Sequence, residues 1–269
     1  MHNTQNDKAL VKPHEASHLV SMTSTETKPT TGRGWTARKR PAAERGRAEH
    51  GWLHARFTFS FAEYFDPDHM GFRSLRVMNN DIIEPGGGFP THPHKDAEIF
   101  TYVISGQLQH KDSMGNGSII TPGNLQYMSA GSGVRHSEFN PSNETATELY
   151  QVWLRPRESG GEPAYSEKHL GVAAKSNALT LLFAGSAKGD ATVIRQDAEI
   201  SFGRLDAGEV LSAPDAPDLP HAWIQVIDGQ LKTLETTLSK ADGLAISDHP
   251  EPFEIRATAD TQFLLFRLK

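Results

Sequence analysis

Two pairs of side chains that commonly bind metals stand out in the sequence, each with one residue between its members. His92 and His94 occur in the run THPHKDAEIF, and His136 and Glu138 occur in SAGSGVRHSEFNPS. Residues i and i+2 of a β-strand point to the same face. If both runs form neighbouring strands of one barrel, all four side chains are predicted to meet around a single cation.

These four side chains define the kind of metal site. Three imidazoles and one carboxylate suit Fe, Zn, Cu or Ni, and they would occupy four positions around an octahedral ion. Two positions would stay open for water, dioxygen or a substrate oxygen, as in catalytic metal sites. For His92 and His94 alone, a pair of solvated loop histidines is the alternative interpretation. The chain has no cysteine, which excludes thiolate ligands, disulfides and a cysteine nucleophile.

The elements that must position these residues are predicted to be β-strands. From Trp52 onward, short apolar runs such as RFTFSF alternate at a period of two, and Gly, Pro, Asn and Asp separate them. Many short strands with turn residues between them predict sandwiches or barrels. Pro93 places the strand of His92 and His94 at a sheet edge or at a strand start, because proline cannot donate a ladder hydrogen bond.

An internal repeat predicts two similar domains. YVISGQL at 102–108 resembles IQVIDGQL at 224–231, and the spacing is close to half of the chain that follows the polar N-terminus. Tandem duplication of one β-domain explains this pattern.

The metal-binding pattern is not repeated with the domain. The positions equivalent to His92 and His94 fall on Asp215 and Pro217, and only His249 and Glu251 repeat a His-x-Glu spacing. The second half is therefore predicted to be structural, without a metal, and to pack against the first barrel and cover an open sheet edge.

The N-terminal region has a different composition. Residues 1–34 are polar and are predicted to form a disordered tail. The basic run ARKRPAAERGR that follows is interpreted as a solvated lead-in rather than a nucleic-acid arm, since it lacks interleaved aromatics and the net charge is -6. With no apolar leader and no run of roughly 20 apolar residues, a cytoplasmic protein without membrane contact is expected. A monomer is the plain expectation.

Several runs resemble a known family. GGGFPTHPHKDAEIFTYVISG is similar to the first cupin motif, with Gly86, His92, His94 and Glu98 in place and Gly106 one residue later than usual. GSGVRHSEFN resembles the second cupin motif. The longer runs HGWLHARFTFSFAEYFDPDHMGFRSLRVMNND, THPHKDAEIFTYVISGQLQHKDSMGN and MSAGSGVRHSEFNPS resemble the pirin family, over roughly residues 44–155.

This resemblance implies an all-β bicupin, two tandem antiparallel β-barrels of the jelly-roll type with short helices. The expected division of the chain is a tail at 1–34, a metal-binding cupin barrel at 35–158, a linker at 159–175 and a C-terminal cupin-like barrel at 176–269.

The resemblance also implies a ligand set and a metal. In the pirin pattern the ligands are His92, His94, His136 and Glu138, whereas most other metallocupins use the carboxylate that is Glu98 here. We expect Glu138 to be the ligand and Glu98 to lie behind the ligands or on the strand surface. Fe²⁺ is the expected ion, with Ni, Cu, Mn and Co as alternatives, because nitrogen and oxygen ligands discriminate poorly among these metals.

The implied activity is that of a quercetin 2,3-dioxygenase, which opens a flavonol with dioxygen and releases carbon monoxide. Glu138 would then also act as the general base for the substrate hydroxyl. Lys95 and Arg135 flank the ligand pairs, where they either steer an anionic substrate or serve as surface charge, and Asp112 suits a turn. The alternative function is an iron-dependent, redox-sensing regulatory protein that binds a transcription factor or an enzyme.

Overall fold

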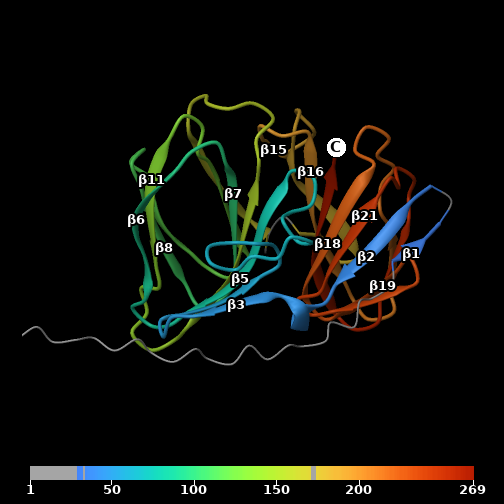
Figure 1. Cartoon of the computed structure of the whole chain (residues 1–269), viewed down its shortest axis with the longest axis horizontal. Helices are drawn as coiled ribbons and strands as arrows, with labels where there is room; N and C mark the ends of the chain where they lie inside the picture. Colours follow the sequence, from blue (N-terminus) through green and yellow to red (C-terminus); the bar gives the residue numbers. More distant parts are fainter. Residues whose placement is uncertain (1–28, 33, 171–173) are drawn as a thin grey trace, which may run out of the picture.

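The computed structural model describes residues 29–32, 34–170 and 174–269, which form two β-barrels side by side (Figure 1). All pairings between named strands in this part of the chain are antiparallel except the short parallel pair β14 and β15. The one helix among the named elements is the 3-10 turn η1 (Ala42–Glu44). The expected all-β bicupin is confirmed.

The first barrel is built from a seven-stranded sheet and a four-stranded sheet. The larger sheet has the order β13 (Ala164–His169), β10 (Asn124–Ser129), β7 (Glu98–Ser105), β12 (Thr147–Leu154), β5 (Leu75–Ile83), β4 (Leu53–Phe57), β3 (Gly46–Glu49). The smaller sheet has the order β6 (Gly88–His94), β11 (Val134–Phe139), β8 (Leu108–Asp112), β9 (Gly117–Ile120). Strand β6 is an edge strand, as Pro93 predicted.

The second barrel combines an eight-stranded and a four-stranded sheet. The larger has the order β1 (Thr30–Thr31), β2 (Thr36–Arg40), β21 (Gly243–Ser247), β18 (His221–Asp228), β23 (Thr261–Leu268), β16 (Ala198–Leu205), β14 (Ala178–Ala184), β15 (Thr192–Val193). The smaller has the order β17 (Val210–Ser212), β22 (Glu254–Ala257), β19 (Gln230–Thr233), β20 (Thr236–Ser239).

The strands near the expected domain boundaries do not all pair within the domain in which they were expected. Strand β2 falls inside the expected N-terminal unit 35–158, yet it pairs with β21 of the second barrel, where Figure 1 shows it beside the C-terminal strands. Strand β13 falls inside the expected linker 159–175, yet it pairs with β10 of the first barrel. Of the expected tail 1–34, residues 1–28 and 33 lie outside the described residues, and Thr30–Thr31 pairs with β2. Sequence pattern placed the strands but not their partners, which depend on contacts far along the chain.

The internal repeat corresponds to one turn built twice. After β7, Gly106 has φ 75°, and after β18, Gly229 has φ 81°. In both places a threonine hydroxyl accepts a hydrogen bond from the backbone N–H of the residue after the glycine. Gln107 N–H donates to Thr147 Oγ1 at 3.1 Å, and Gln230 N–H donates to Thr261 Oγ1 at 3.0 Å. This shared geometry supports the inference of a duplicated domain.

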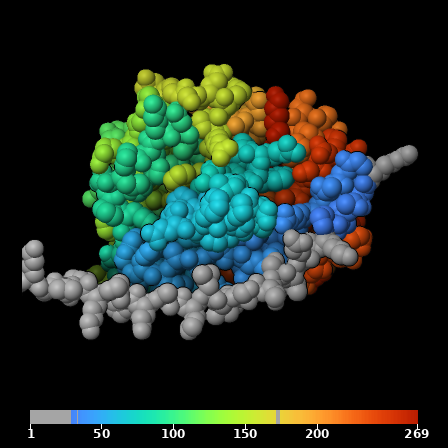
Figure 2. All heavy atoms as spheres, in the orientation of Figure 1, coloured from blue at the N-terminus to red at the C-terminus, as the bar shows by residue number. Residues whose placement is uncertain are grey.

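A large apolar core joins the barrels. Phe100, Tyr102 and Tyr127 of the first barrel pack with Phe183, Phe202 and other residues of the second in one buried cluster. The Phe100 and Phe183 ring centroids are 4.8 Å apart. The outer surfaces of the two barrels also meet in the space-filling view of Figure 2. The second barrel thus covers a sheet face of the first, rather than the sheet edge that was predicted.

Within the described residues, no helix is long and apolar enough to cross a membrane.

Candidate metal centre and its cavity

The two predicted pairs of site residues lie on adjacent strands inside the first barrel. Strand β6 carries His92 and His94, strand β11 carries His136 and Glu138, and His136 is the register partner of His92. Between His136 and Glu138 the register shifts by a bulge. Bulges commonly occur beside active sites, where they redirect a side chain.

The three histidines form a group that could hold a metal ion. One ligand nitrogen each from His92, His94 and His136 lies within 4.8 Å of the other two. The Nε2 atoms of His92 and His136 are 3.0 Å apart. Two nitrogens at right angles around one ion lie about 3 Å apart, because a metal–nitrogen bond is about 2.1 Å long. The spacing therefore fits two ligands of a common cation.

Hydrogen bonding leaves the ring nitrogens suited to a metal. His92 Nδ1 lies 2.9 Å from the carbonyl oxygen of Pro90, which can only accept, so Nδ1 carries the proton and Nε2 of the neutral ring keeps its lone pair. His94 Nε2 and His136 Nδ1 are buried without a hydrogen-bond partner. Buried polar atoms of this kind are normally satisfied. A cation fits these residues, and it would satisfy His94 Nε2.

Burial keeps two of the rings neutral. It lowers the pKa of His94 to about 4, and the neighbouring His136 and His92 rings add to the effect while Glu138 opposes it. Burial likewise lowers the pKa of His136 to about 3, together with His92 and His110. Since the neutral imidazole is the metal ligand, both rings are ready to bind at neutral pH.

Glu138 groups with His136 and His110 and not with all three histidines of the triad, so the four predicted ligands are not brought together as one group. Glu138, His110 and His136 form a second group of side chains that could hold a metal ion. All three are buried, and one ligand atom of each lies within 4.8 Å of the other two. Gln151 Nε2 donates to Glu138 Oε2 at 2.9 Å, and Trp153 Nε1 donates to Gln151 Oε1 at 3.3 Å. This chain of hydrogen bonds fixes the carboxylate.

His110, Gln151 and Trp153 were not predicted from the sequence. His110 opens the run HKDSMGNGS, which was interpreted as a turn, and its Nε2 lies 3.1 Å from Asp112 Oδ2. Asp112 also caps that turn by accepting from the backbone N–H groups of Met114 and Asn116. The same-face spacing of His110 and Asp112, and of Gln151 and Trp153, was the available sequence indication.

Glu98 lies away from the triad. It is buried, accepts from Tyr127 Oη at 2.5 Å and Ser129 Oγ at 2.6 Å, and accepts from the backbone N–H of Arg195 at 3.0 Å. Because Arg195 belongs to the segment after the first barrel, this carboxylate ties the two halves together. A strand-surface position for Glu98 is therefore wrong.

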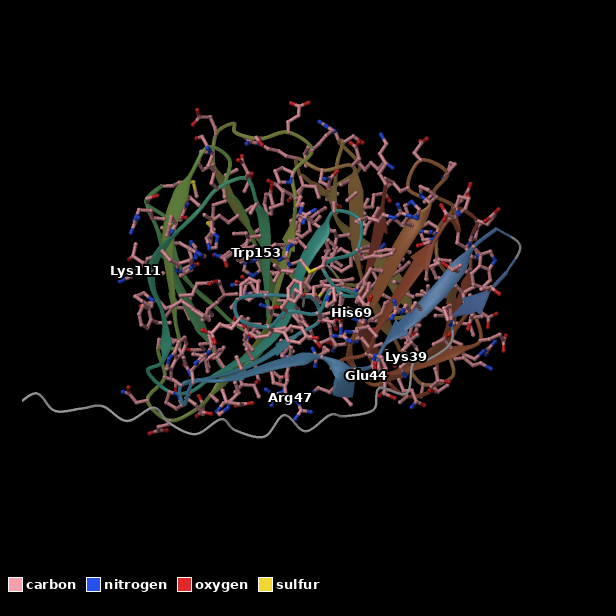
Figure 3. The ribbon with its side chains drawn as sticks, viewed as in Figure 1. Lys39, Glu44, Arg47, His69, Lys111 and Trp153 are labelled. Carbon is pink, nitrogen blue, oxygen red and sulfur yellow. The ribbon has the colours of Figure 1, made fainter. Side chains whose placement is uncertain are left out.

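A cavity of about 1070 Å³ opens beside the triad. Its lining includes His92, His94 and Glu138, and its walls are aromatic: Trp52, Phe57, Phe61, Tyr64, Phe89, Trp153. Trp153 lies inside the barrel, whereas Lys111 lies on its outer side (Figure 3). The Trp153 ring meets His94 edge-on, with centroids 4.8 Å apart. The cavity can therefore hold a flat aromatic molecule next to the histidines.

Two polar residues of the cavity wall lie on β5. Asn79 and Asp81 are both buried, and each has an Oδ1 atom without a hydrogen-bond partner. Burial raises the pKa of the Asp81 carboxyl to about 7, with the charge of Glu138 adding to the effect and Arg45 opposing it.

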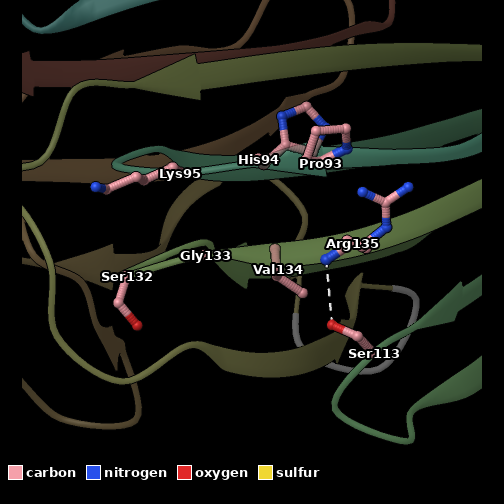
Figure 4. Close-up of a pocket in the computed structure, with 8 residues that line it drawn as sticks. All are labelled: Pro93, His94, Lys95, Ser113, Ser132, Gly133, Val134 and Arg135. Carbon is pink, nitrogen blue, oxygen red and sulfur yellow. Dashed lines mark hydrogen bonds between the residues drawn. The ribbon is translucent and has the colours of Figure 1, made fainter.

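Lys95 and Arg135 line a different hollow. Figure 4 shows them with Ser113, Ser132 and Gly133 around a space of about 400 Å³ at the ends of β6 and β11. Neither Lys95 nor Arg135 lines the large cavity, so their position gives no support to a role in steering substrate into it.

Comparison with known proteins gives consistent results. Residues 38–154 match the family described as Pirin, and residues 181–268 match the family described as Quercetinase C-terminal cupin domain. The chain is 43% identical over 229 residues to the quercetin 2,3-dioxygenase of Escherichia coli strain K12, covering 85% of this chain and 97% of that protein. It is 38% identical to a pirin-like protein of Caulobacter vibrioides, covering 84% and 97%.

A solved structure matches the fold and carries a metal. The bacterial pirin YhhW from Escherichia coli, in complex with nickel(II), superimposes with a TM-score of 0.81 at 42% identity, covering 86% of this chain and 98% of that chain.

Proposed function

Because the chain belongs to the pirin family, we propose that it is a metal-dependent dioxygenase that opens flavonols such as quercetin with dioxygen. The observation that carries this proposal is the histidine triad at the wall of an aromatic cavity. A relative of high identity named quercetin 2,3-dioxygenase supports the choice of substrate class.

The metal ligands in this proposal are His92, His94, His136 and Glu138. The nickel(II) complex of a relative supports a divalent transition metal, and Fe²⁺ is our choice, with Ni, Cu, Mn and Co as alternatives. When bound, such an ion supplies Lewis acidity toward the enol oxygen of the substrate and leaves positions open for oxygen ligands.

The protein's own side chains supply binding and proton transfer. The aromatic walls hold the flat rings of the flavonol and exclude water. Glu138 accepts the proton of the flavonol hydroxyl as general base. Gln151 holds Glu138 Oε2, so the carboxylate keeps one orientation while it accepts this proton.

The cavity also bears on the regulatory alternative. An enzyme needs a concave site of roughly 300–1,000 Å³ beside its metal, and the cavity of about 1070 Å³ provides one. A redox-sensing protein requires only a partner surface that responds to the metal. The cavity favours the enzyme.

The test is oxygen uptake with quercetin by protein of verified metal content. His94→Ala is expected to lower turnover by about 100-fold or more. Removing a residue that only hydrogen-bonds to a metal ligand already lowers metal affinity or activity by about 10–100-fold. His169→Ala removes an exposed histidine of β13 and serves as the matched control, with unchanged activity. Turnover by metal-free protein equal to that of loaded protein would refute the proposal.

A further inference from the structure

The lining of the cavity carries two hydrogen-bond acceptors that have no partner among the residues the structure describes. Asn79 and Asp81 lie two residues apart on β5, so their side chains share the inner face of the strand. Their exposed fractions are 3% and 5%, and Oδ1 of each lacks a partner. A buried acceptor without a donor is unfavourable, because it has lost its hydrogen bonds to water and gained none in return. Both residues line the same cavity as His92 and His94.

Their neighbours on the sheet do not supply the missing donors. Asn79 is the register partner of Phe57 on β4 and of Gln151 on β12. The Gln151 amide donates instead to Glu138. Asp81 is flanked by Ala55 and Leu149, which have no polar side-chain atoms. A molecule in the cavity can therefore supply the missing donors.

The rest of the lining defines that occupant. Aromatic side chains line the same cavity as the two acceptors, so the complementary ligand is a flat ring system that carries hydroxyl donors. A site built to bind a hydroxyl discriminates strongly against an analogue that lacks it, because the polar group of the protein is then left unpaired.

We infer that Asp81 and Asn79 determine specificity by accepting hydrogen bonds from ring hydroxyls of the substrate other than the one whose proton Glu138 accepts. The inference rests on the proposed function and extends it, since it assigns a preference for polyhydroxylated over unsubstituted aromatic substrates. Neither residue takes part in the bond-breaking step.

The experiment compares quercetin with 3-hydroxyflavone, which keeps the reacting hydroxyl but lacks the others. Asp81→Leu and Asn79→Leu remove the acceptors and keep the number and branching of the side-chain heavy atoms. Each is expected to lower kcat/KM for quercetin by about 10-fold, mainly through KM, and to leave 3-hydroxyflavone within about 2-fold, because one hydrogen bond contributes roughly a factor of ten.

Asn80→Leu is the matched control. Asn80 lies on the same strand but faces the other way, where its amide donates to Glu148 Oε1 and to the carbonyl oxygen of Leu149. This variant is expected to keep the wild-type ratio between the two substrates. If Asp81→Leu does not fold, Asn79→Leu decides alone, since replacing the uncharged Asn79 leaves the charges of the protein unchanged.

Two failures can be told apart. If the wild-type protein with metal oxidises neither flavonol, the proposed function fails, and binding of the same two flavonols, followed by tryptophan fluorescence, still tests the two acceptors. If the protein is active and the variants lose both substrates in equal proportion, the proposed function stands and the assignment of Asp81 and Asn79 is overturned.

Discussion

At the scale of single residues, the centre depends on histidines held neutral by burial. The pKa values of His94 and His136, about 4 and 3, lie well below the ordinary value near 6.5. In the unfolded chain the same rings take up protons at a higher pH than in the folded chain. In the metal-free protein, the free energy of unfolding is therefore highest with respect to these two rings above about pH 6.5. It decreases as the pH falls from there through the folded pKa values.

The first prediction concerns this acid sensitivity. In the presence of a chelator, the Tm of the wild-type protein is expected to fall between pH 6.5 and pH 4. His136→Gln removes one of the buried rings, so its Tm should fall less steeply over that range. His169→Gln, which changes an exposed ring, should follow the wild type. Parallel curves for His136→Gln and wild type, measured by thermal unfolding, would contradict the explanation.

The site was partly predictable from its residues. Two same-face pairs in neighbouring strands predicted that His92, His94, His136 and Glu138 meet, and the structure brings the three histidines together, with Glu138 grouped with His136 and His110. The roles of Gln151 and Trp153 were not predictable, since they depend on β12 of the opposite sheet facing β11 across the barrel. Asn79 and Asp81 were missed for the same reason. Local spacing indicates which side chains share a face, but closure of a barrel decides what that face meets.

At the scale of elements, the contact between β6 and β11 sets the geometry of the centre. A Cβ atom at Gly88 would lie 2.4 Å from the carbonyl oxygen of Glu138 and 2.5 Å from Cδ1 of Phe139. Contacts this short require the strands to move apart. Glycine at this position therefore permits the close approach that brings the two ligand pairs together.

The second prediction tests this close approach. Gly88→Ala is expected to separate β6 from β11 and to lower metal affinity by about 10-fold or more, as do changes behind metal ligands. Metal content after dialysis and Tm are the measurements. Gly117→Ala on β9 is the matched control, because its nearest atoms would be 3.8 Å from the new Cβ. Full metal retention by Gly88→Ala would show that the strands tolerate the displacement.

At the scale of the whole molecule, the two barrels share one core. Phe183 is fully buried and its ring contacts both Phe100 and Tyr127, at centroid distances of 4.8 Å and 5.4 Å. Glu98 adds a polar link, since it accepts from the backbone of Arg195. The C-terminal barrel therefore supports the sheet that faces the metal centre on its other side.

The third prediction follows from this shared core. Phe183→Ala is expected to lower the free energy of unfolding by about 3–5 kcal/mol and to keep a single transition for both barrels. Calorimetry and denaturant titration measure both quantities. Val193→Ala, at a position 54% exposed, should change the stability by less than about 0.5 kcal/mol. Two separate transitions, with the first barrel unaffected, would mean that the barrels unfold independently.

The pairing of β2 with β21 has a consequence for how the chain is made. Ala37 is the register partner of Ile246, so β2, one of the first described strands to be synthesised, can pair with β21 only after most of the chain has been made. Until then β2 presents an unpaired edge, which is prone to association with other nascent chains. If the two barrels were produced as separate fragments, the edge of β2 would stay unpaired in the N-terminal fragment. The C-terminal fragment would lack the strand that pairs with β21.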